Sequence, residues 1–314
     1  MTLEQEVFVP APGPHGGDGA RLAAALGVPP SNILDLSVSL NPSAPDVAER
    51  VRRHADAVTR YPDPGAAAAA LAAAIGVDEE RLVLTNGGAE AIALVAAEHP
   101  CGDVDPCDFS LYARHLKWVE STGPRWRSNP RNPTGKLADR GESAAVWDEA
   151  FYPLAAGEWS RGDFGAVVVG SLTKVFACPG LRAGYVIAPA AKFASALRAR
   201  QPEWSLNGLA AAILPELLAA AHLKRWAANI RQLRGILETL LRRNGLEPEP
   251  SDANYVLVRN ASGVRNHLAA AGVLVRDTAS FGIPGGIRVA VPGPDGLDRL
   301  GDALRGLPDP ADRA

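Results

Sequence analysis

The stretch from Gly165 to Gly184, GAVVVGSLTKVFACPGLRAG, constrains the fold more than any other part of the chain. Its early part, Ala166–Val169, is a short apolar run rich in β-branched residues, which predicts a buried strand. Lys174 follows soon after that strand. Open α/β sheets bind their ligands at the carboxyl ends of their strands, so this position places the lysine where a ligand site is expected.

The polar residues around Lys174 suit one kind of cofactor. Ser171 and Thr173 flank the lysine, and Arg182 follows within GLRAGY. Lysine condenses with carbonyl compounds, whereas hydroxyls and a guanidinium suit a phosphate. Pyridoxal 5'-phosphate (PLP) carries both an aldehyde and a phosphate. Taken alone, this stretch is explained about equally well by a solvated lysine and arginine in a surface loop.

Three other stretches favour the cofactor. WDEAF places Asp148 at the end of a short apolar run, and PLP needs an anion facing its pyridinium nitrogen. LVLTNGGAEA, which starts at Leu82, predicts a strand, a glycine turn and a helix start. Helix starts bind phosphate through their free N–H groups. The third stretch is NPRNPTG, from Asn129 to Gly135.

These motifs, in this order, resemble those of the fold-type I PLP enzymes of the class I/II aminotransferase family. The N-terminal part narrows the resemblance. His15-Gly16-Gly17, then DLSVSLNPSAP from Asp35 to Pro45, then YPDP from Tyr61, resemble the cobalamin-pathway branch. That branch contains L-threonine-O-3-phosphate decarboxylase and is close to histidinol-phosphate aminotransferase. The resemblance covers nearly the whole chain, but its motifs do not separate decarboxylation from amino transfer.

The resemblance implies a large α/β domain with a mixed sheet and a small C-terminal α/β domain. We expect the large domain at residues 45–205 and the small domain at residues 206–314, joined by an N-terminal arm at residues 1–44. The middle of the large domain, between Cys101 and Asp148, is shorter than is usual in the family. Lys136–Val146 hardly supplies a helix and a full strand, so we expect at least one helix and part of a strand to be missing. Phe109–Ser121 predicts a helix.

The resemblance also implies roles for the cofactor residues. Lys174 would bind PLP and move protons at the α-carbon, and Asp148 would pair with the ring nitrogen. Asn132 would donate to the ring 3'-oxygen, and Phe109, or else Tyr112, would stack on the ring. The phosphate would be held by the N–H groups of Gly88, Ala89 and Glu90, by Ser171, Thr173 and Arg182, and by Tyr61 of a neighbouring subunit. Phe151 departs from the family, which often has a tyrosine there to contact the 3'-oxygen.

Substrate groups follow from the same resemblance. Arg288 in GGIRVAV matches the arginine that binds the α-carboxylate, which a planar guanidinium fits in bidentate fashion. Arg276 is a candidate for a substrate phosphate or carboxylate, and Asn254 is expected to help orient it. His15 lies on a glycine-rich arm that could close over the ligand. A mobile terminal residue is an equally good interpretation of His15.

The N-terminal motifs favour one reaction, the decarboxylation of L-threonine O-3-phosphate to 1-aminopropan-2-ol phosphate in cobalamin biosynthesis. The first alternative is an aminotransferase that acts on histidinol phosphate or a similar amino acid. The second is a degenerate PLP-fold protein that only binds, an idea motivated by the shortened middle. YPDP and the shortened middle also suggest a homodimer with shared sites.

Composition excludes several other classes of protein. A net charge of -3 argues against nucleic-acid binding. The three cysteines, Cys101, Cys107 and Cys178, fit no metal-binding pattern. Alanine runs such as Ala66–Ala70 are too short to span a membrane, and MTLEQEVFVP lacks the features of a signal peptide. We therefore expect a cytoplasmic enzyme that binds a small phosphorylated amino acid and needs no metal.

Overall fold

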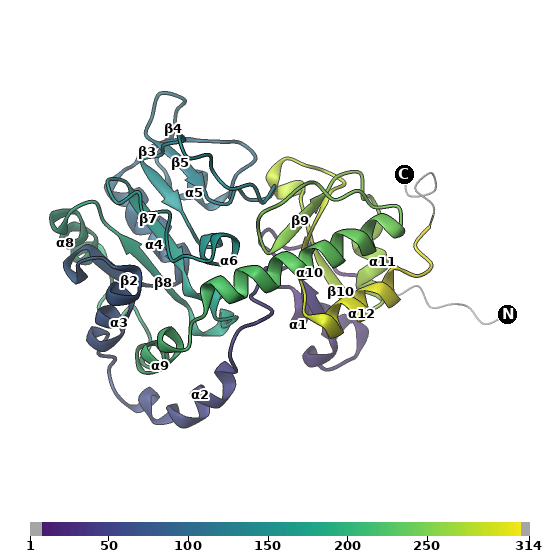
Figure 1. Cartoon of the computed structure of the whole chain (residues 1–314), viewed down its shortest axis with the longest axis horizontal. Helices are drawn as coiled ribbons and strands as arrows, with labels where there is room; N and C mark the ends of the chain where they lie inside the picture. The colour runs from purple at the N-terminus through teal and green to yellow at the C-terminus, as the bar shows by residue number, and fades with distance from the viewer. Residues whose placement is uncertain (1–7, 309–314) are drawn as a thin grey trace.

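The computed structural model describes residues 8–308 and shows two α/β lobes (Figure 1). Residues 1–7 and 309–314, the outer ends of the expected arm and small domain, lie outside the described residues. Within residues 8–308, no helix combines the length and the apolarity needed to cross a membrane.

The large lobe is built on a mixed sheet with the strand order β2-β8-β7-β6-β5-β3-β4. Neighbouring strands from β4 to β7 run parallel, whereas β8 is antiparallel to both β2 and β7. All five residues of β7 are buried, as its valine run predicts. The strands are β2 (Leu82–Asn86), β3 (Cys101–Val104), β4 (Trp118–Val119), β5 (Arg125–Ser128), β6 (Val146–Asp148), β7 (Val167–Ser171) and β8 (Ala183–Ile187).

Helices cover both faces of this sheet. One face packs against α3, α6, α9 and the start of α10 in a core that includes Trp147 and Phe176. The other face packs against α4, α5 and α8 around Trp126 and Tyr112. The helices of this lobe are α2 (Val47–Arg53), α3 (Gly65–Ile75), α4 (Gly87–Glu98), α5 (Leu111–His115), α6 (Tyr152–Ala156), α7 (Leu172–Val175), α8 (Ala191–Arg200), α9 (Gly208–Ala219) and α10 (Leu223–Arg243).

The small lobe has a four-stranded sheet with the order β1-β10-β11-β9. β1 (Leu34–Leu36), from the N-terminal arm, pairs in parallel with β10 (Val273–Asp277). β11 (Ile287–Ala290) is antiparallel to β10 and to β9 (Tyr255–Val258). The arm therefore joins the small lobe, as expected. Its other helices are α1 (Gly19–Leu26), α11 (Val264–Ala270) and α12 (Pro294–Leu304).

Helix α10 runs from one lobe to the other (Figure 1). Its first half, with Trp226 and Ile230, belongs to the core of the large lobe, as does the whole of α9. Its second half, with Leu233, Leu237 and Leu241, belongs to the core of the small lobe. We propose that the division between the lobes falls inside α10 and not at residue 206.

The shortened middle of the large lobe has no helix between β5 and β6, as expected. The prediction of a helix over Phe109–Ser121 is wrong beyond His115. The chain turns extended at Leu116, and Trp118 then pairs with Cys101 as an added edge strand. The backbone stays hydrogen-bonded without the longer helix, because the N–H groups of Lys117 and Trp118 both donate to the carbonyl of Pro100.

Candidate active site

A cavity of about 280 Å³ lies between the ends of the large-sheet strands and the small lobe, and it gathers most of the predicted site residues. It is bordered by both lobes and by the N-terminal arm. The predicted residues that line it are His15, Gly88, Ala89, Phe109, Asn132, Asp148, Ser171, Thr173, Lys174, Arg182, Arg276 and Arg288.

Lys174 is placed in this cavity by α7, which follows β7 directly. The turn is held from the arm, because Asn41 donates its backbone N–H to the carbonyl of Lys174 (3.0 Å) and its side-chain amide to that of Val175 (2.9 Å). Burial and, after it, the charges of Arg288 and Arg182 lower the pKa of Lys174 to about 8. About one tenth of the amine is therefore unprotonated at pH 7, and this is the form that attacks a carbonyl.

Asp148 ends β6 and faces the same cavity. Its Oδ1 accepts the backbone N–H of Ala150 (3.0 Å), and its Oδ2 accepts the hydroxyl of Tyr112 (2.8 Å). Burial raises the pKa of Asp148 to about 6, while these two hydrogen bonds and the charge of Lys174 act to lower it. The carboxyl group is thus mostly ionised at neutral pH and has the charge that a pyridinium nitrogen requires of its partner.

The turn between β2 and α4 forms a close-packed cradle beside Ser171. Gly87 adopts a positive φ of 76°, and a Cβ added there would lie 2.5 Å from the guanidinium of Arg182. A Cβ at Gly184 would lie 2.5 and 2.6 Å from the backbone of Gly87 and Gly88. The first turn of the twelve-residue α4 has no side-chain cap. Free N–H groups beside an arginine and a serine suit a phosphate, so the residues present fit PLP.

The ring side of the cavity holds Phe109, Asn132 and Phe151. Phe109 meets Tyr112 edge-on, with ring centroids 5.8 Å apart. The Oδ1 of Asn132 accepts a hydrogen bond from Arg288 (2.5 Å), which leaves its amide nitrogen as the donor. Phe151 packs edge-on against Tyr255 and has no hydroxyl to offer. This arrangement agrees with the expectation that the PLP ring stacks on Phe109 and that the amide of Asn132 donates to its 3'-oxygen.

Two buried arginines line the opposite side. Arg288 donates to Asn132 and to the carbonyl of Ser37 (3.3 Å), while its Nε has no partner. Arg276 donates to the carbonyls of Gly13 (2.9 Å) and Pro14 and to the hydroxyl of Ser280 (2.8 Å). Arg276 therefore holds the arm. The ring of His15, on that arm, lies 5.9 Å from that of Phe109.

Three predicted residues do not line the cavity. The carboxylate of Glu90 accepts hydrogen bonds from the backbone of Asn86 (2.7 Å) and from Ser205 (2.5 Å). The side-chain amide of Asn254 donates to the carbonyl of Ser39 (2.8 Å), a residue that does line the cavity. Tyr61 is 78% exposed and stacks on Trp204 at the surface, 4.3 Å between ring centroids. Tyr61 is thus free to contact another subunit but not this chain's own cavity.

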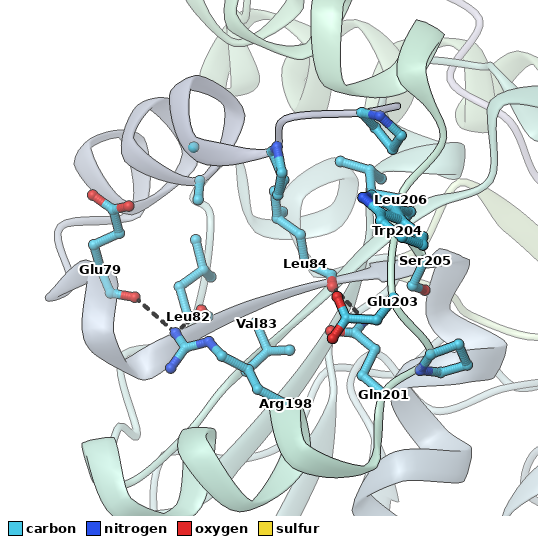
Figure 2. A pocket seen from close by; sticks show the side chains of 15 residues that line it. Glu79, Leu82, Val83, Leu84, Arg198, Gln201, Glu203, Trp204, Ser205 and Leu206 are labelled. Carbon is cyan, nitrogen blue, oxygen red and sulfur yellow. Dashed lines mark hydrogen bonds between the residues drawn. The ribbon is translucent and has the colours of Figure 1, made fainter. Parts of the chain in front are cut away.

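A second hollow, of about 510 Å³, lies beside β2 and is bordered by Trp204 (Figure 2). Figure 2 shows that two of its polar side chains, those of Arg198 and Gln201, are already engaged with the backbone. Arg198 donates to the carbonyls of Glu79 (3.4 Å) and Leu82 (2.8 Å), and Gln201 donates to that of Leu84 (2.7 Å). It contains none of the residues that sequence reasoning assigned to catalysis, so we place the active site in the first cavity.

Sequence reasoning missed several residues that line the cavity. Ser37 and Ser39 lie two apart in the segment DLSVSLNP, a spacing that puts both side chains on one face of an extended chain. The hydroxyl of Ser39 is buried and has no hydrogen-bond partner in the described part of the chain. This alternation is the sequence signal that could have identified the two serines as lining residues. The other missed lining residues include Ser128 and Phe281, for which local sequence gave no signal.

Comparison with known proteins identifies the family. Residues 126–304 match the family model of aminotransferase class I and II. A histidinol-phosphate aminotransferase from Methylococcus capsulatus is 30% identical over 87% of this chain and 89% of its own. The histidinol-phosphate aminotransferase of Sinorhizobium meliloti, solved with PLP, has a TM-score of 0.79 at 17% identity and covers 98% of this chain and 99% of its own.

L-threonine-O-3-phosphate decarboxylase from Porphyromonas gingivalis superposes with a TM-score of 0.73 at 21% identity, over 87% of this chain and 98% of its own. At such identities the superpositions show a shared fold. The family match, in contrast, extends over more than half of the chain and includes the segments that carry Asp148, Lys174 and Arg288. The chain therefore belongs to the class I and II aminotransferase family and is a PLP-dependent enzyme.

Proposed function

We propose that the enzyme transfers an amino group between a small phosphorylated amine, such as histidinol phosphate, and a 2-oxo acid. The name of the Methylococcus relative supports this reaction over decarboxylation, so the first alternative from the sequence replaces its main interpretation. A protein that only binds is not supported, because the chain belongs to an enzyme family and Lys174 and Asp148 line one cavity.

The observation that carries the proposal is the uncompensated charge of Arg288. This guanidinium is 5% exposed, and it forms no ion pair with a carboxylate within residues 8–308. Burial lowers its pKa. Burial and, after it, the charge of Arg288 lower the pKa of Arg276 to about 10. A buried charge without an opposite charge beside it destabilises the folded protein. Two arginines facing one cavity therefore call for an anionic substrate.

Lys174, Asp148 and Arg288 would have different roles in this reaction. When bound, PLP draws electrons away from the carbon that carries the amino group. Lys174 would move the proton at that carbon, because its amine has a pKa near 8 and can both accept and release protons at neutral pH. Asp148 would keep the ring nitrogen protonated. Arg288 would bind the phosphate of one substrate and the carboxylate of the other in turn.

A second candidate reaction is the decarboxylation of L-threonine O-3-phosphate. Two observations favour it: the HGG and DLSVSLNP segments of the arm, and the presence of a second arginine, Arg276, for a substrate with two anionic groups. In this case Arg288 would bind the carboxylate and Arg276 the phosphate. The proposed place in cobalamin biosynthesis depends on this second reaction.

One experiment separates the two reactions. The purified PLP enzyme is incubated with histidinol phosphate and 2-oxoglutarate, and glutamate is measured. In parallel it is incubated with L-threonine O-3-phosphate, and released CO2 is measured. Glutamate without CO2 supports amino transfer, whereas CO2 without glutamate supports decarboxylation and overturns the main proposal. An Arg288→Gln variant should lose either activity while it still binds PLP.

We further propose a homodimer in which Tyr61 completes the partner's cofactor site. Tyr61, Trp204 and Val58 are large apolar side chains that are exposed in the single chain, and a second copy would cover them. Sedimentation at micromolar concentration tests this proposal. A monomer that still turns over substrate would contradict it.

A further inference from the structure

We infer that Tyr112 is a positioning residue that orients the Asp148 carboxylate and keeps it ionised toward the cofactor. Its hydroxyl donates to Oδ2 of Asp148 at 2.8 Å. The phenol is 1% exposed, and its ring packs against Phe109 and Trp126, each 5.8 Å away between centroids. Packing thus fixes the ring, and the only group that the ring presents to Asp148 is its hydroxyl.

This hydroxyl can act only as a donor to the carboxylate. Burial raises the pKa of Tyr112 well above its usual value, and the charges of Asp148 and Asp108 raise it further. The proton therefore stays on Tyr112 across the working pH range. With Oδ1 of Asp148 held by the N–H of Ala150, both oxygens of the carboxylate are fixed from the protein side. The carboxylate is left with one orientation in the cavity.

A buried network behind Tyr112 keeps it in place. Asp108, 3% exposed, accepts hydrogen bonds from the Ser128 hydroxyl (2.5 Å) and from the N–H of Phe109 (2.8 Å). The Ser128 hydroxyl in turn accepts the N–H of Asn132 (2.9 Å). The end of β5, the start of α5 and the NPRNPTG turn are therefore tied to one acid. Asp108 also raises the pKa of Asp148, and the Tyr112 hydrogen bond opposes this effect.

The ionisation of Asp148 has contributions from several sides. Lys174 on α7 favours the charged form, and Asp108 before α5 opposes it. Asp148 in turn interacts electrostatically with its neighbour Glu149, with Tyr185 on β8 and with Tyr255 on β9. Within this set, the side chain that donates a hydrogen bond to Asp148 is that of Tyr112. The inference rests on the proposed role of Asp148 and holds for either reaction.

The test measures PLP affinity of the cofactor-free protein by equilibrium dialysis from pH 5.5 to 8.5. Wild-type affinity should fall as the pH drops through about 6, where Asp148 becomes protonated. Tyr112→Phe keeps the ring but removes the hydrogen bond, and should move this midpoint up by about one pH unit. Near pH 6.5 its affinity should be several-fold lower than wild type. Tyr185→Phe, an equally buried tyrosine outside the cavity, is the matched control and should not move the midpoint.

Two further variants make the result decisive. Asp108→Asn removes the opposing charge and should move the midpoint down, opposite to Tyr112→Phe. In an Asp148→Asn background, Tyr112→Phe should have no pH-dependent effect. Equal loss of affinity at every pH, or the same shift without Asp148, would show that Tyr112 only fills space. If Asp148→Asn alone leaves the affinity unchanged at every pH, the proposed role of Asp148 is wrong, and this inference with it.

Discussion

Replacing Asp148 with asparagine should stabilise the cofactor-free protein while it weakens PLP binding. Burial raises the pKa of this carboxyl from 3.8 to about 6, a difference of roughly two units at about 1.4 kcal/mol each. The ionised group thus destabilises the folded state by about 3 kcal/mol above pH 6. Asparagine has the same shape, can accept the Ala150 N–H, and carries no charge.

The sign of the effect with pH follows from linkage. Because the folded-state pKa is raised, the destabilisation is absent below about pH 4, grows between pH 4 and 6, and is complete above pH 6. The stabilisation of Asp148→Asn should therefore be about half as large at pH 5 as at pH 8. Thermal unfolding of cofactor-free wild type and variant at both pH values measures it, and the melting temperature at pH 8 should rise by several degrees.

Glu149 offers a matched control for this experiment. Burial raises its pKa from 4.5 to about 7, but it does not line the cavity. Glu149→Gln should thus raise the melting temperature at pH 8 but change PLP affinity far less than Asp148→Asn does, because Glu149 can act on the cavity only through its electrostatic interaction with Asp148. If Asp148→Asn is no more stable than wild type at pH 8, or gains equally at pH 5, then burial does not control this carboxyl and the reasoning is wrong.

Three other substitutions test separate parts of the site. Lys174→Ala should leave the fold intact and abolish the visible absorption band that borohydride removes from the wild type; a band that persists would place the cofactor on another lysine. Gly184→Ala puts a methyl group within 2.6 Å of the Gly87–Gly88 backbone, so PLP affinity should fall at least tenfold, as fluorescence titration would show. Arg288→Lys should lower kcat/KM by one to two decades with PLP affinity unchanged, and a normal kcat/KM would exclude Arg288 as the substrate anchor.

Much of the cofactor side of the site could be predicted from sequence, because its residues lie in short motifs tied to a local structure. Lys174 follows a buried strand, and the glycines of NGGAEA mark a helix start. The hydrogen bond from Tyr112 to Asp148 joins residues 36 positions apart and has no local signature. Arg276 also shows the limit of local reasoning, since its sequence does not reveal that it holds the carbonyls of the arm.

Much of the fold could be predicted for similar reasons, whereas the helix predicted over Phe109–Ser121 is wrong beyond His115. A strand with a strong apolar pattern, such as β7, appears as predicted. The helix after Phe109 stops at His115 because the following residues pair with β3. A strand of two residues depends on the edge that it joins, and that edge is set by tertiary structure and not by local pattern.

The large lobe is inserted into the small one, because β1 precedes it and the remaining small-lobe strands follow it. Both described ends of the chain accordingly lie at the small lobe (Figure 1). Two connections join the large lobe to the small lobe, namely the Ser37–Asn41 segment and α10. Ser37 and Ser39 line the cavity, and the backbone N–H of Asn41 donates a hydrogen bond to the carbonyl of Lys174. Any change in the angle between the lobes would therefore shift Ser37, Ser39 and Asn41, and with them the wall of the cavity.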